Sequence, residues 1–550
     1  MSSLRGPPSP APVNPNRLLA KSIPQVTISG RTKAHFGRNV ISPAPAGKQP
    51  TKEIRMFPLH CRCWIAVVLL VPTAARAESN EEAARKHCEK GEAARQKQDF
   101  DRAIAEFTKA IRLDPKNILF YHYRSAAYQE KGDFDKEIAD CTHILKANPR
   151  DTSALGNRGN AYLMKNEYDK ALVDLNQAIQ IDEKMSGLYC SRGYCFARKG
   201  DLDKAIRDFS RCLRLDPKDK EAYVQRGQAY AEKRELDRAI ADFTEAIKLD
   251  PQDVWAYSWR GGAHYRKGEF DKAIADCDQL LKLDPKFAAG HYIRGAVYLE
   301  EGDYQKALVD CEQAIRLDPK DPYARNGRGL YHARRGDQDK AIRDFTSAIR
   351  LSPKDATFRF NRGNSYRENG DLDQAIADYS EAIKLDTRMI VAYNNRGGAY
   401  REKGEEDKAL LDCEQSIHLD PKSPIPYGNR ALLLSASPVA RVRNGKKAVD
   451  DARKACELTE WKNAWCLDIL AAAYAELGDF QKAIEWEKKA LELSKDSPER
   501  ILREAQARLK LYEQGKPYRE DHDAIRKRAK KKENKRDEGE ALPSPAIPKR

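Results

Sequence analysis

The sequence predicts an all-α fold, an α-solenoid superhelix of stacked helix–turn–helix units with a C-terminal capping helix. The first observation is a strict 34-residue recurrence of strings ending in Asp-Pro or Ser-Pro. The second is a pair of small residues at fixed places in each copy, and the third is a turn signal between them. The recurring prolines are Pro115, Pro217, Pro251, Pro285, Pro319, Pro353 and Pro421.

Taking each such proline as position 32, ten repeats run in register over residues 84–423. Position 8 is glycine and position 20 is alanine in all but the second copy, which has Ser125 and Glu137. Small residues allow two helices to touch, and large side chains such as Phe107 and Phe243 at position 24 fill the space beside them. Each repeat is therefore expected to be a closely packed helical hairpin, except the second, whose two helices are expected to pack less closely.

Local signals set the ends of these helices. Between the two helices stands a Gly-Asp pair, as in Gly132-Asp133 and Gly370-Asp371. Glycine suits a left-handed C-cap, and the acid favours the N-terminus of the next helix. The proline at position 32 lacks an N–H donor and must end the second helix.

With these motifs the sequence resembles the tetratricopeptide repeat family, in its bacterial exported form, and the resemblance implies stacked helix–turn–helix units. Two degenerate copies follow in residues 424–497, the first with an insertion around residues 435–444. An amphipathic helix within 498–515 is expected to cover the last open face.

The net charge of +15 belongs to the two ends of the chain. Residues 1–77 carry 11 Lys and Arg against one acid, residues 500–550 carry 16 against 9, and the middle is close to neutral. A groove that follows nucleic-acid phosphates is therefore not expected. Residues 516–550 are interpreted as a basic, disordered, solvated tail, with nuclear localisation or surface binding as the alternative.

Residues 56–77 have the pattern of a secretory signal peptide, with an apolar stretch over 64–71 and a small-x-small ending at Ala77. The apolar stretch is too short for a stable membrane span. Residues 1–55 are interpreted as a disordered leader or a mis-assigned start, with Met56 as the true start. The expected location is periplasmic or secreted after cleavage near Ala77, with a cytoplasmic protein as the alternative.

Position 7 is arginine and position 23 is aspartate in the same ten units. In a hairpin these positions lie opposite one another, so we expect structural ion pairs such as Arg260–Asp276 and Arg294–Asp310, bidentate where geometry allows. The alternative is a polybasic ligand track. The last unit has Leu470 and Trp486 at these positions, so the charge is lost on both sides together.

The family resemblance implies that a ligand binds a concave groove lined by the first helices, at positions 2, 5, 6, 9, 12 and 13. Side-chain amides can bind an extended peptide backbone without regard to its sequence. The alternative is that these residues are tolerated polar side chains. The ligand-binding candidates are Asn157, Asn160, Tyr194, Gln225, Gln228, Trp259, Asn361, Asn364, Asn394, Asn395 and Asn429.

Some members of the family clamp a C-terminal carboxylate with asparagines and basic residues in successive units. Asn364 and Asn395 match the two amide positions. The basic residues are missing, because those places hold Phe360, Ile425 and Asn429. A cochaperone-type carboxylate clamp is therefore incomplete in this sequence.

The sequence has twelve cysteines but no disulfide framework is expected, because four of them stand at the core position 24 of their repeats. Cys141, Cys277, Cys311 and Cys413 share position 24, while Cys190 and Cys195 point to different faces of one helix. Cys61 and Cys63 would leave with the signal peptide. No metal-binding or catalytic motif is found, so no metal, cofactor or catalytic residue is predicted.

The sequence thus favours a non-catalytic scaffold that binds proteins or peptides, with a role in envelope assembly or secretion. An accessory or regulatory subunit of an enzyme complex and a cytoplasmic cochaperone are the alternatives. The oligomeric state is left open.

Overall fold

The computed structural model describes residues 77–495 and 497–521. The leader over 1–55, the signal peptide before Ala77, Cys61, Cys63 and the tail beyond residue 521 lie outside the described residues. The described chain forms two compact units, divided between Pro285 and Lys286. It contains helices and no strand, which confirms the all-α solenoid fold.

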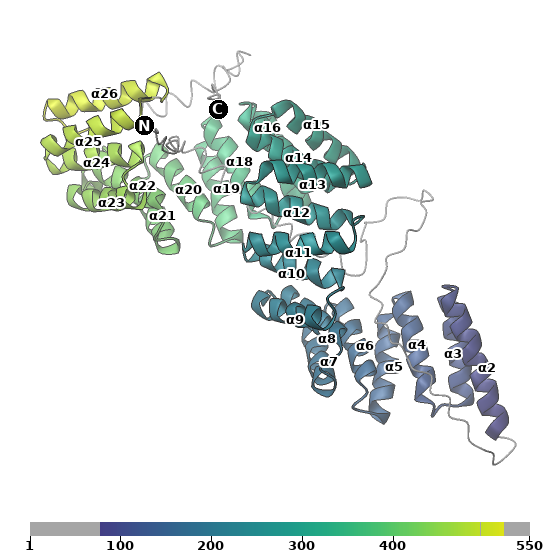
Figure 1. Cartoon of the computed structure of the whole chain (residues 1–550). Coiled ribbons are helices and arrows are strands. Elements are labelled where there is room, and N and C mark those ends of the chain that lie inside the picture. The colour runs from purple at the N-terminus through teal and green to yellow at the C-terminus, as the bar shows by residue number, and fades with distance from the viewer. Residues whose placement is uncertain (1–76, 496, 522–550) are drawn as a thin grey trace, which may run out of the picture. The chain divides into compact units, whose positions relative to one another are not determined.

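The first unit consists of helices that pair along the chain as the repeats require (Figure 1). Its helices are α2 (Ala77–Gln96), α3 (Phe100–Leu113), α4 (Ile118–Lys131), α5 (Phe134–Ala147), α6 (Thr152–Met164), α7 (Tyr168–Ile181), α8 (Ser186–Arg198), α9 (Leu202–Leu215), α10 (Lys220–Glu232), α11 (Leu236–Leu249), α12 (Val254–Lys267) and α13 (Phe270–Leu283).

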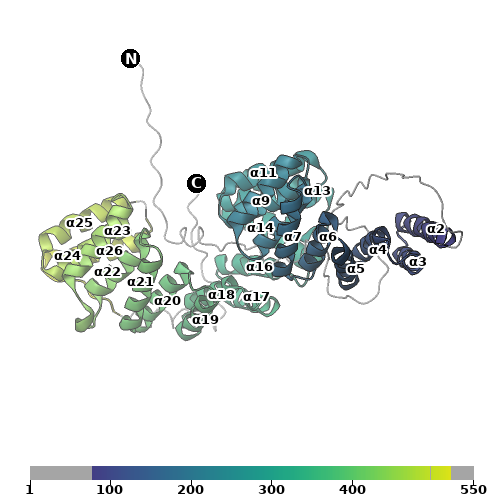
Figure 2. The ribbon, with the colours of Figure 1, turned by 90° about the horizontal axis from the view of Figure 1, so that it is seen from below.

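The second unit continues the pattern and adds the degenerate repeats and the cap, whose helices α22 to α26 lie together in both views (Figure 2). Its helices are α14 (Ala288–Glu301), α15 (Tyr304–Leu317), α16 (Pro322–Arg334), α17 (Gln338–Leu351), α18 (Ala356–Asn369), α19 (Leu372–Leu385), α20 (Ile390–Lys403), α21 (Glu406–Leu419), α22 (Pro424–Ala436), the short 3-10 helix η3 (Ala440–Val442), α23 (Gly445–Leu458), α24 (Ala464–Leu477), α25 (Phe480–Leu493) and α26 (Glu499–Glu513).

The helix ends follow the local signals. Gly132 and Gly370 are C-caps in the left-handed region, with φ of 81° and 92°. The carboxylates of Asp201 and Asp303 accept hydrogen bonds from the backbone N–H three residues later, at 3.3 and 3.2 Å. Asp133 starts α5 without such a cap and instead binds Lys136 at 2.8 Å, so the acid at this place does not always cap the helix.

Close helix contact depends on which residue stands at position 24. A Cβ on Gly227 would lie 2.7 Å from Phe243, whereas a Cβ on Gly261 would find its nearest atom, the Cβ of Asp276, at 3.4 Å. The fifth repeat therefore needs a glycine beside its phenylalanine, because no other residue leaves room for the ring. Ser125 can replace glycine in the second repeat because its position 24 is Cys141, and both side chains are fully buried.

The first helices of neighbouring repeats also contact each other. Within the first unit these contacts link α2 to α4, α6 to α8, α8 to α10 and α10 to α12. Within the second unit they run from α14 through α16, α18, α20 and α22 to α24. We call the surface made by these helices in each unit the first-helix face.

The capping helix α26 packs on α25 and seals the last repeat with a buried charged cluster. Arg508 forms ion pairs with Asp468 at 2.5 Å and with Glu487 at 3.4 Å. Burial raises the pKa of Glu487 to about 9. Glu487 occupies position 24 of the last repeat, where the ten in-register repeats have Phe, Tyr, Leu or Cys, and its buried carboxyl group faces Arg508 of the cap.

Candidate functional site

The arginine at position 7 forms a bidentate ion pair with the aspartate at position 23 in each of the ten units that contain both residues. Arg260 donates from Nε to Asp276 at 2.9 Å and from Nη2 at 2.6 Å. Arg294 does the same with Asp310 at 2.7 and 2.9 Å. The aspartates are buried and the arginines half-buried, so these groups are engaged inside the hairpins and cannot form a polybasic ligand track.

In several of these units the third nitrogen of the arginine, Nη1, donates to a side chain of the preceding repeat. Arg260 Nη1 donates to Thr244 Oγ1 at 3.1 Å, and Arg396 Nη1 donates to Ser380 Oγ at 2.9 Å. The same bond joins Arg192 to Asn176 at 2.8 Å. Each of these arginines therefore ties its own hairpin together and fastens it to the one before.

Four of the predicted ligand-binding residues are buried within the repeats. Tyr194, Gln225 and Gln228 are each 7% exposed, and Asn361 is 5% exposed. Gln225 donates to Glu221 at 3.1 Å, and Asn361 donates to Asn326 of the preceding repeat at 2.9 Å. These side chains offer little surface to a ligand, and they support the helices around them.

Asn364 and Asn395 lie together across two neighbouring repeats. Asn395 Nδ2 and the Tyr379 hydroxyl both donate to Asn364 Oδ1, at 2.7 and 2.8 Å. Phe360 beside them is 2% exposed and packs against Tyr379. The two amides that match a carboxylate clamp are thus hydrogen-bonded to protein groups.

The remaining candidates are partly exposed and keep the predicted role as an expectation: Asn157, Asn160, Trp259, Asn394 and Asn429. The Trp259 ring stacks on buried Phe243, with 6.5 Å between centroids. Sequence reasoning missed Trp255, at position 2 of the same helix α12, which is 38% exposed. Position 2 is one of the positions expected to line the groove, so the repeat register could have identified Trp255.

The segment that follows the cap returns to the first-helix face of the second unit. The backbone N–H of Glu520 donates to Ala436 O on α22 at 2.9 Å. Arg401 on α20 donates to the Glu520 carboxylate at 2.6 Å. Arg519 donates to Ser435 O at 3.1 Å and forms an ion pair with Glu476 on α24. Residues 516–520, which we call the return segment, therefore cross three first helices.

The return segment changes the interpretation of the tail. The sequence predicts a solvated tail from residue 516, but residues 516–520 are held by Arg401, Glu476 and two backbone carbonyls. The carbonyls belong to the last turn of α22, where helical hydrogen bonding leaves acceptors without a partner. This part of the prediction is wrong because those acceptors and two opposite charges lie within reach of the chain.

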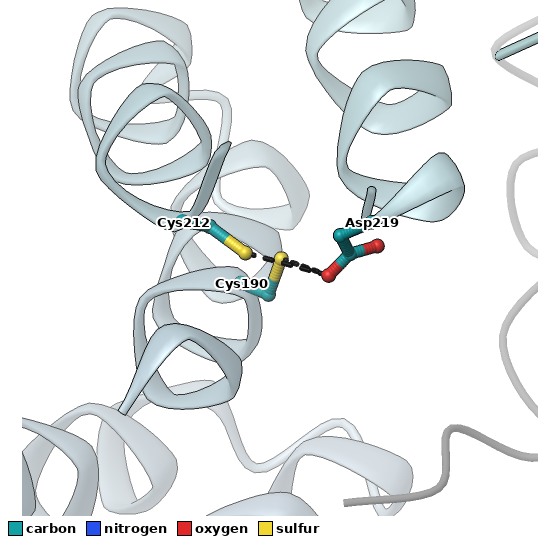
Figure 3. Close-up of side chains that lie close together, drawn as sticks. All are labelled: Cys190, Cys212 and Asp219. Atoms are coloured by element: carbon teal, nitrogen blue, oxygen red, sulfur yellow. Dashed lines mark hydrogen bonds between the residues drawn. The ribbon is translucent and has the colours of Figure 1, made fainter. Parts of the chain in front are cut away.

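The described cysteines are all free and buried. Cys141, Cys277, Cys311 and Cys413 lie in the core at position 24, each no more than 3% exposed. Cys190 and Cys212 differ, because their sulfurs approach one carboxylate, that of Asp219 (Figure 3). The repeat pattern of the sequence does not reveal this cluster.

Comparisons with known proteins agree with the repeat geometry. Models of the tetratricopeptide repeat match residues 152–185, 191–254, 224–288, 260–322, 293–360, 345–377, 390–423 and 463–496, and a TPR repeat model matches 91–132 and 363–404. Together they span well over half of the sequence. The chain belongs to the tetratricopeptide repeat family.

Solved tetratricopeptide structures resemble this chain at low identity. The Cut9–Hcn1 structure is 15% identical, with a TM-score of 0.45 over 83% of this chain and 96% of that one. Yeast Tom70 is 17% identical, with a TM-score of 0.37 over 79% and 96%. YrrB, described as having an unusual peptide-binding site, is 22% identical, with a TM-score of 0.31 over 34% and 95%. No curated protein matches the sequence.

Tetratricopeptide repeat proteins bind other proteins or peptides, and this repeat array is a protein-interaction scaffold in that broad sense. Every helix among the described residues is too short or too polar to cross a bilayer.

Proposed function

We propose that this tetratricopeptide repeat protein is a non-catalytic scaffold that holds extended peptide segments of its partners on the first-helix face. The observation that carries the proposal is the return segment, a stretch of the chain itself lying across α20, α22 and α24. It is held by hydrogen bonds to two backbone carbonyls of α22 and by ion pairs with Arg401 and Glu476, which is how an extended peptide can be held without a deep pocket.

The contacts also indicate the class of peptide. Glu476 forms an ion pair with Arg519, and Arg401 forms an ion pair with Glu520. Arg508 of the cap lies over the ring of Tyr518, with its Cζ 5.7 Å from the ring centroid. A partner segment with an aromatic residue, a basic residue and an acidic residue in succession would satisfy the same three groups.

The test uses a labelled peptide of residues 515–521 and the chain shortened to end at Gly515. Fluorescence anisotropy is expected to show saturable binding, and full-length protein is expected to bind the peptide less well because its own segment competes. Glu476→Lys should weaken binding at least tenfold, since the cation of Arg519 then meets a like charge. A peptide carrying Arg519→Glu should recover binding to that variant.

The matched control is Glu460→Lys, a charge reversal at an acid whose side chain is 76% exposed and which does not bind the return segment. Equal weakening by both reversals would mean that only net charge matters and would refute the proposed site.

We also propose that the scaffold works after export, in envelope assembly or secretion. The support is the signal-peptide pattern of residues 56–77, which ends where α2 begins. N-terminal sequencing of the mature protein tests this: Glu78 as the first residue supports export, and an intact 56–77 segment supports the cytoplasmic alternative. Co-purification of an enzyme activity with the protein would instead favour the accessory-subunit alternative.

A further inference from the structure

Two cysteines and an aspartate converge at the joint between the repeats that begin at residues 186 and 220. Cys190 lies on α8, Cys212 on α9, and Asp219 caps the start of α10. Their ligand atoms all lie within 4.8 Å of one another (Figure 3). We propose that these three residues bind a zinc ion, which the repeat family does not require.

The distances match a tetrahedral zinc site. Cys190 Sγ lies 3.5 Å and Cys212 Sγ lies 3.4 Å from Asp219 Oδ2. With zinc–sulfur bonds of about 2.3 Å and zinc–oxygen bonds of about 2.1 Å, tetrahedral angles separate sulfur and oxygen ligands by about 3.6 Å. An ion can therefore sit between the three atoms with only small side-chain movements.

The carboxylate is already oriented for this role. Asp219 Oδ1 accepts a hydrogen bond from the backbone N–H of Ala222 at 3.0 Å, which leaves Oδ2 directed at the two sulfurs. A hydrogen bond to one oxygen of a metal-binding carboxylate fixes the direction of the other. The two sulfurs are buried, and Asp219 is only partly buried, which leaves a route for the ion from the side of the aspartate.

The other repeats show that the cysteines are the unusual element. An aspartate equivalent to Asp219 caps α6, α12, α16 and α18. At the place of Cys212, the helices before those caps have alanine or isoleucine, as in Ala246 and Ile144. In the second repeat the residue equivalent to Cys190 is His122, which reaches the capping Asp151 at 3.2 Å. Position 5 thus reaches the capping carboxylate, but only here are two thiols present.

Ligand chemistry selects the ion. Two thiolates favour zinc or copper(I), and the hard carboxylate oxygen favours zinc of the two. Binding replaces both thiol protons, so two protons leave for each ion bound, and three protein ligands leave the fourth position to water. Because Asp219 caps α10, the first helix of the next repeat, the ion would fix the joint between the two hairpins.

Reduced full-length protein, freed of metal and titrated with cobalt(II), provides the test. Wild type is expected to bind one equivalent, with a thiolate-to-cobalt charge-transfer band and the intense visible bands of tetrahedral cobalt, and zinc should displace it. Cys212→Ala, which copies the sibling repeats, should weaken binding at least about 100-fold, beyond the loss seen for outer-shell changes. Asp219→Asn should also weaken binding while preserving the helix cap, because asparagine caps equally well.

The matched control is Cys195→Ala, which removes a buried thiol of the same helix α8 outside the cluster and should bind cobalt like wild type. Wild type that binds no cobalt or zinc would overturn the proposal, as would binding that survives Cys212→Ala. So would an unreduced peptide map of freshly isolated protein in which Cys190 is joined to Cys212 by a disulfide.

Discussion

Arg260 holds both carboxylate oxygens of Asp276, at 2.9 and 2.6 Å, across the two helices of one repeat. Its remaining Nη1 binds Thr244 of the preceding repeat. One side chain thus links the two helices of its hairpin and also links that hairpin to the preceding repeat. The same arrangement recurs one repeat earlier, with Arg226, Asp242 and Ser210. The ladder is a structural device, and it leaves peptide binding to other residues.

Asp276→Ala should destabilise its repeat by about 3–5 kcal/mol, because Arg260 is left half-buried without its carboxylate. Amide hydrogen exchange of α12 and α13 should accelerate, and the exposed Asp271→Ala should change it little. Replacing both partners, Arg260→Leu with Asp276→Leu, should restore much of the loss, since the last repeat is apolar at these positions with Leu470 and Trp486. Unchanged exchange in Asp276→Ala would contradict the prediction.

Gly227→Ala should destabilise by about 1–3 kcal/mol, because the new methyl group would meet Phe243 at 2.7 Å in a filled core. Gly261→Ala is the matched substitution in the next repeat, where the nearest atom is 3.4 Å away. It should be nearly neutral or slightly stabilising, since alanine favours helices over glycine. Urea unfolding of the two variants should separate them, and adding Phe243→Cys should rescue the first. Equal losses would show that position 24 does not set the glycine requirement.

Much of the fold could be predicted from the sequence because each repeat contains the residues that start and end its own helices. The spacing of Pro251 and Pro285 fixed the register, and positions 7 and 23 on opposite helices indicated the Arg260–Asp276 pair. The second partner of Arg260 could not be predicted, because its bond to Thr244 depends on the separation of neighbouring hairpins. Position 25 also varies among threonine, serine, asparagine, aspartate and glutamate, which hides the pattern.

The candidate site was harder to predict than the fold. The register placed Asn361 and Gln225 on the first helices, but whether such a residue is exposed depends on the side chains of the next repeat. The return segment was missed because a charge-rich stretch has the composition of a solvated tail. Cys190, Cys212 and Asp219 were missed because they stand at positions 5, 27 and 34, far apart in sequence and brought together only by the hairpin.

Glu137 should make the stability of the second repeat depend on pH. Its carboxyl group is 1% exposed, and burial raises its pKa to about 9 from an ordinary 4.5. Between these values the unfolded chain has released a proton that the folded chain keeps, so stability falls as pH rises from about 4.5 to 9. Glu137→Gln removes this pH dependence, because the amide does not titrate.

The variant and wild type should therefore differ little at pH 5, and the variant should be more stable by about 2–4 kcal/mol at pH 8.5. Thermal or urea unfolding at the two pH values checks this. Glu89→Gln, at an exposed acid on α2, should give a difference that does not change with pH. A Glu137→Gln advantage that shrinks as pH rises would reverse the assigned sign.

Arg508→Leu should detach the capping helix from the last repeat. Arg508 is the cation shared by Asp468 and Glu487, so its loss leaves two acids facing each other in a buried place, at a cost of about 3–5 kcal/mol. Faster hydrogen exchange and proteolysis within α26 are expected. Arg503→Leu on the same helix breaks only an exposed pair with Glu499 and should cost about 0.5 kcal/mol or less.

Because the return segment continues from α26, Arg508→Leu should also speed hydrogen exchange in residues 516–520. Arg401→Ala should speed exchange in that segment and leave α26 protected from exchange. Equal protection of α26 in wild type and Arg508→Leu would show that apolar packing alone holds the cap.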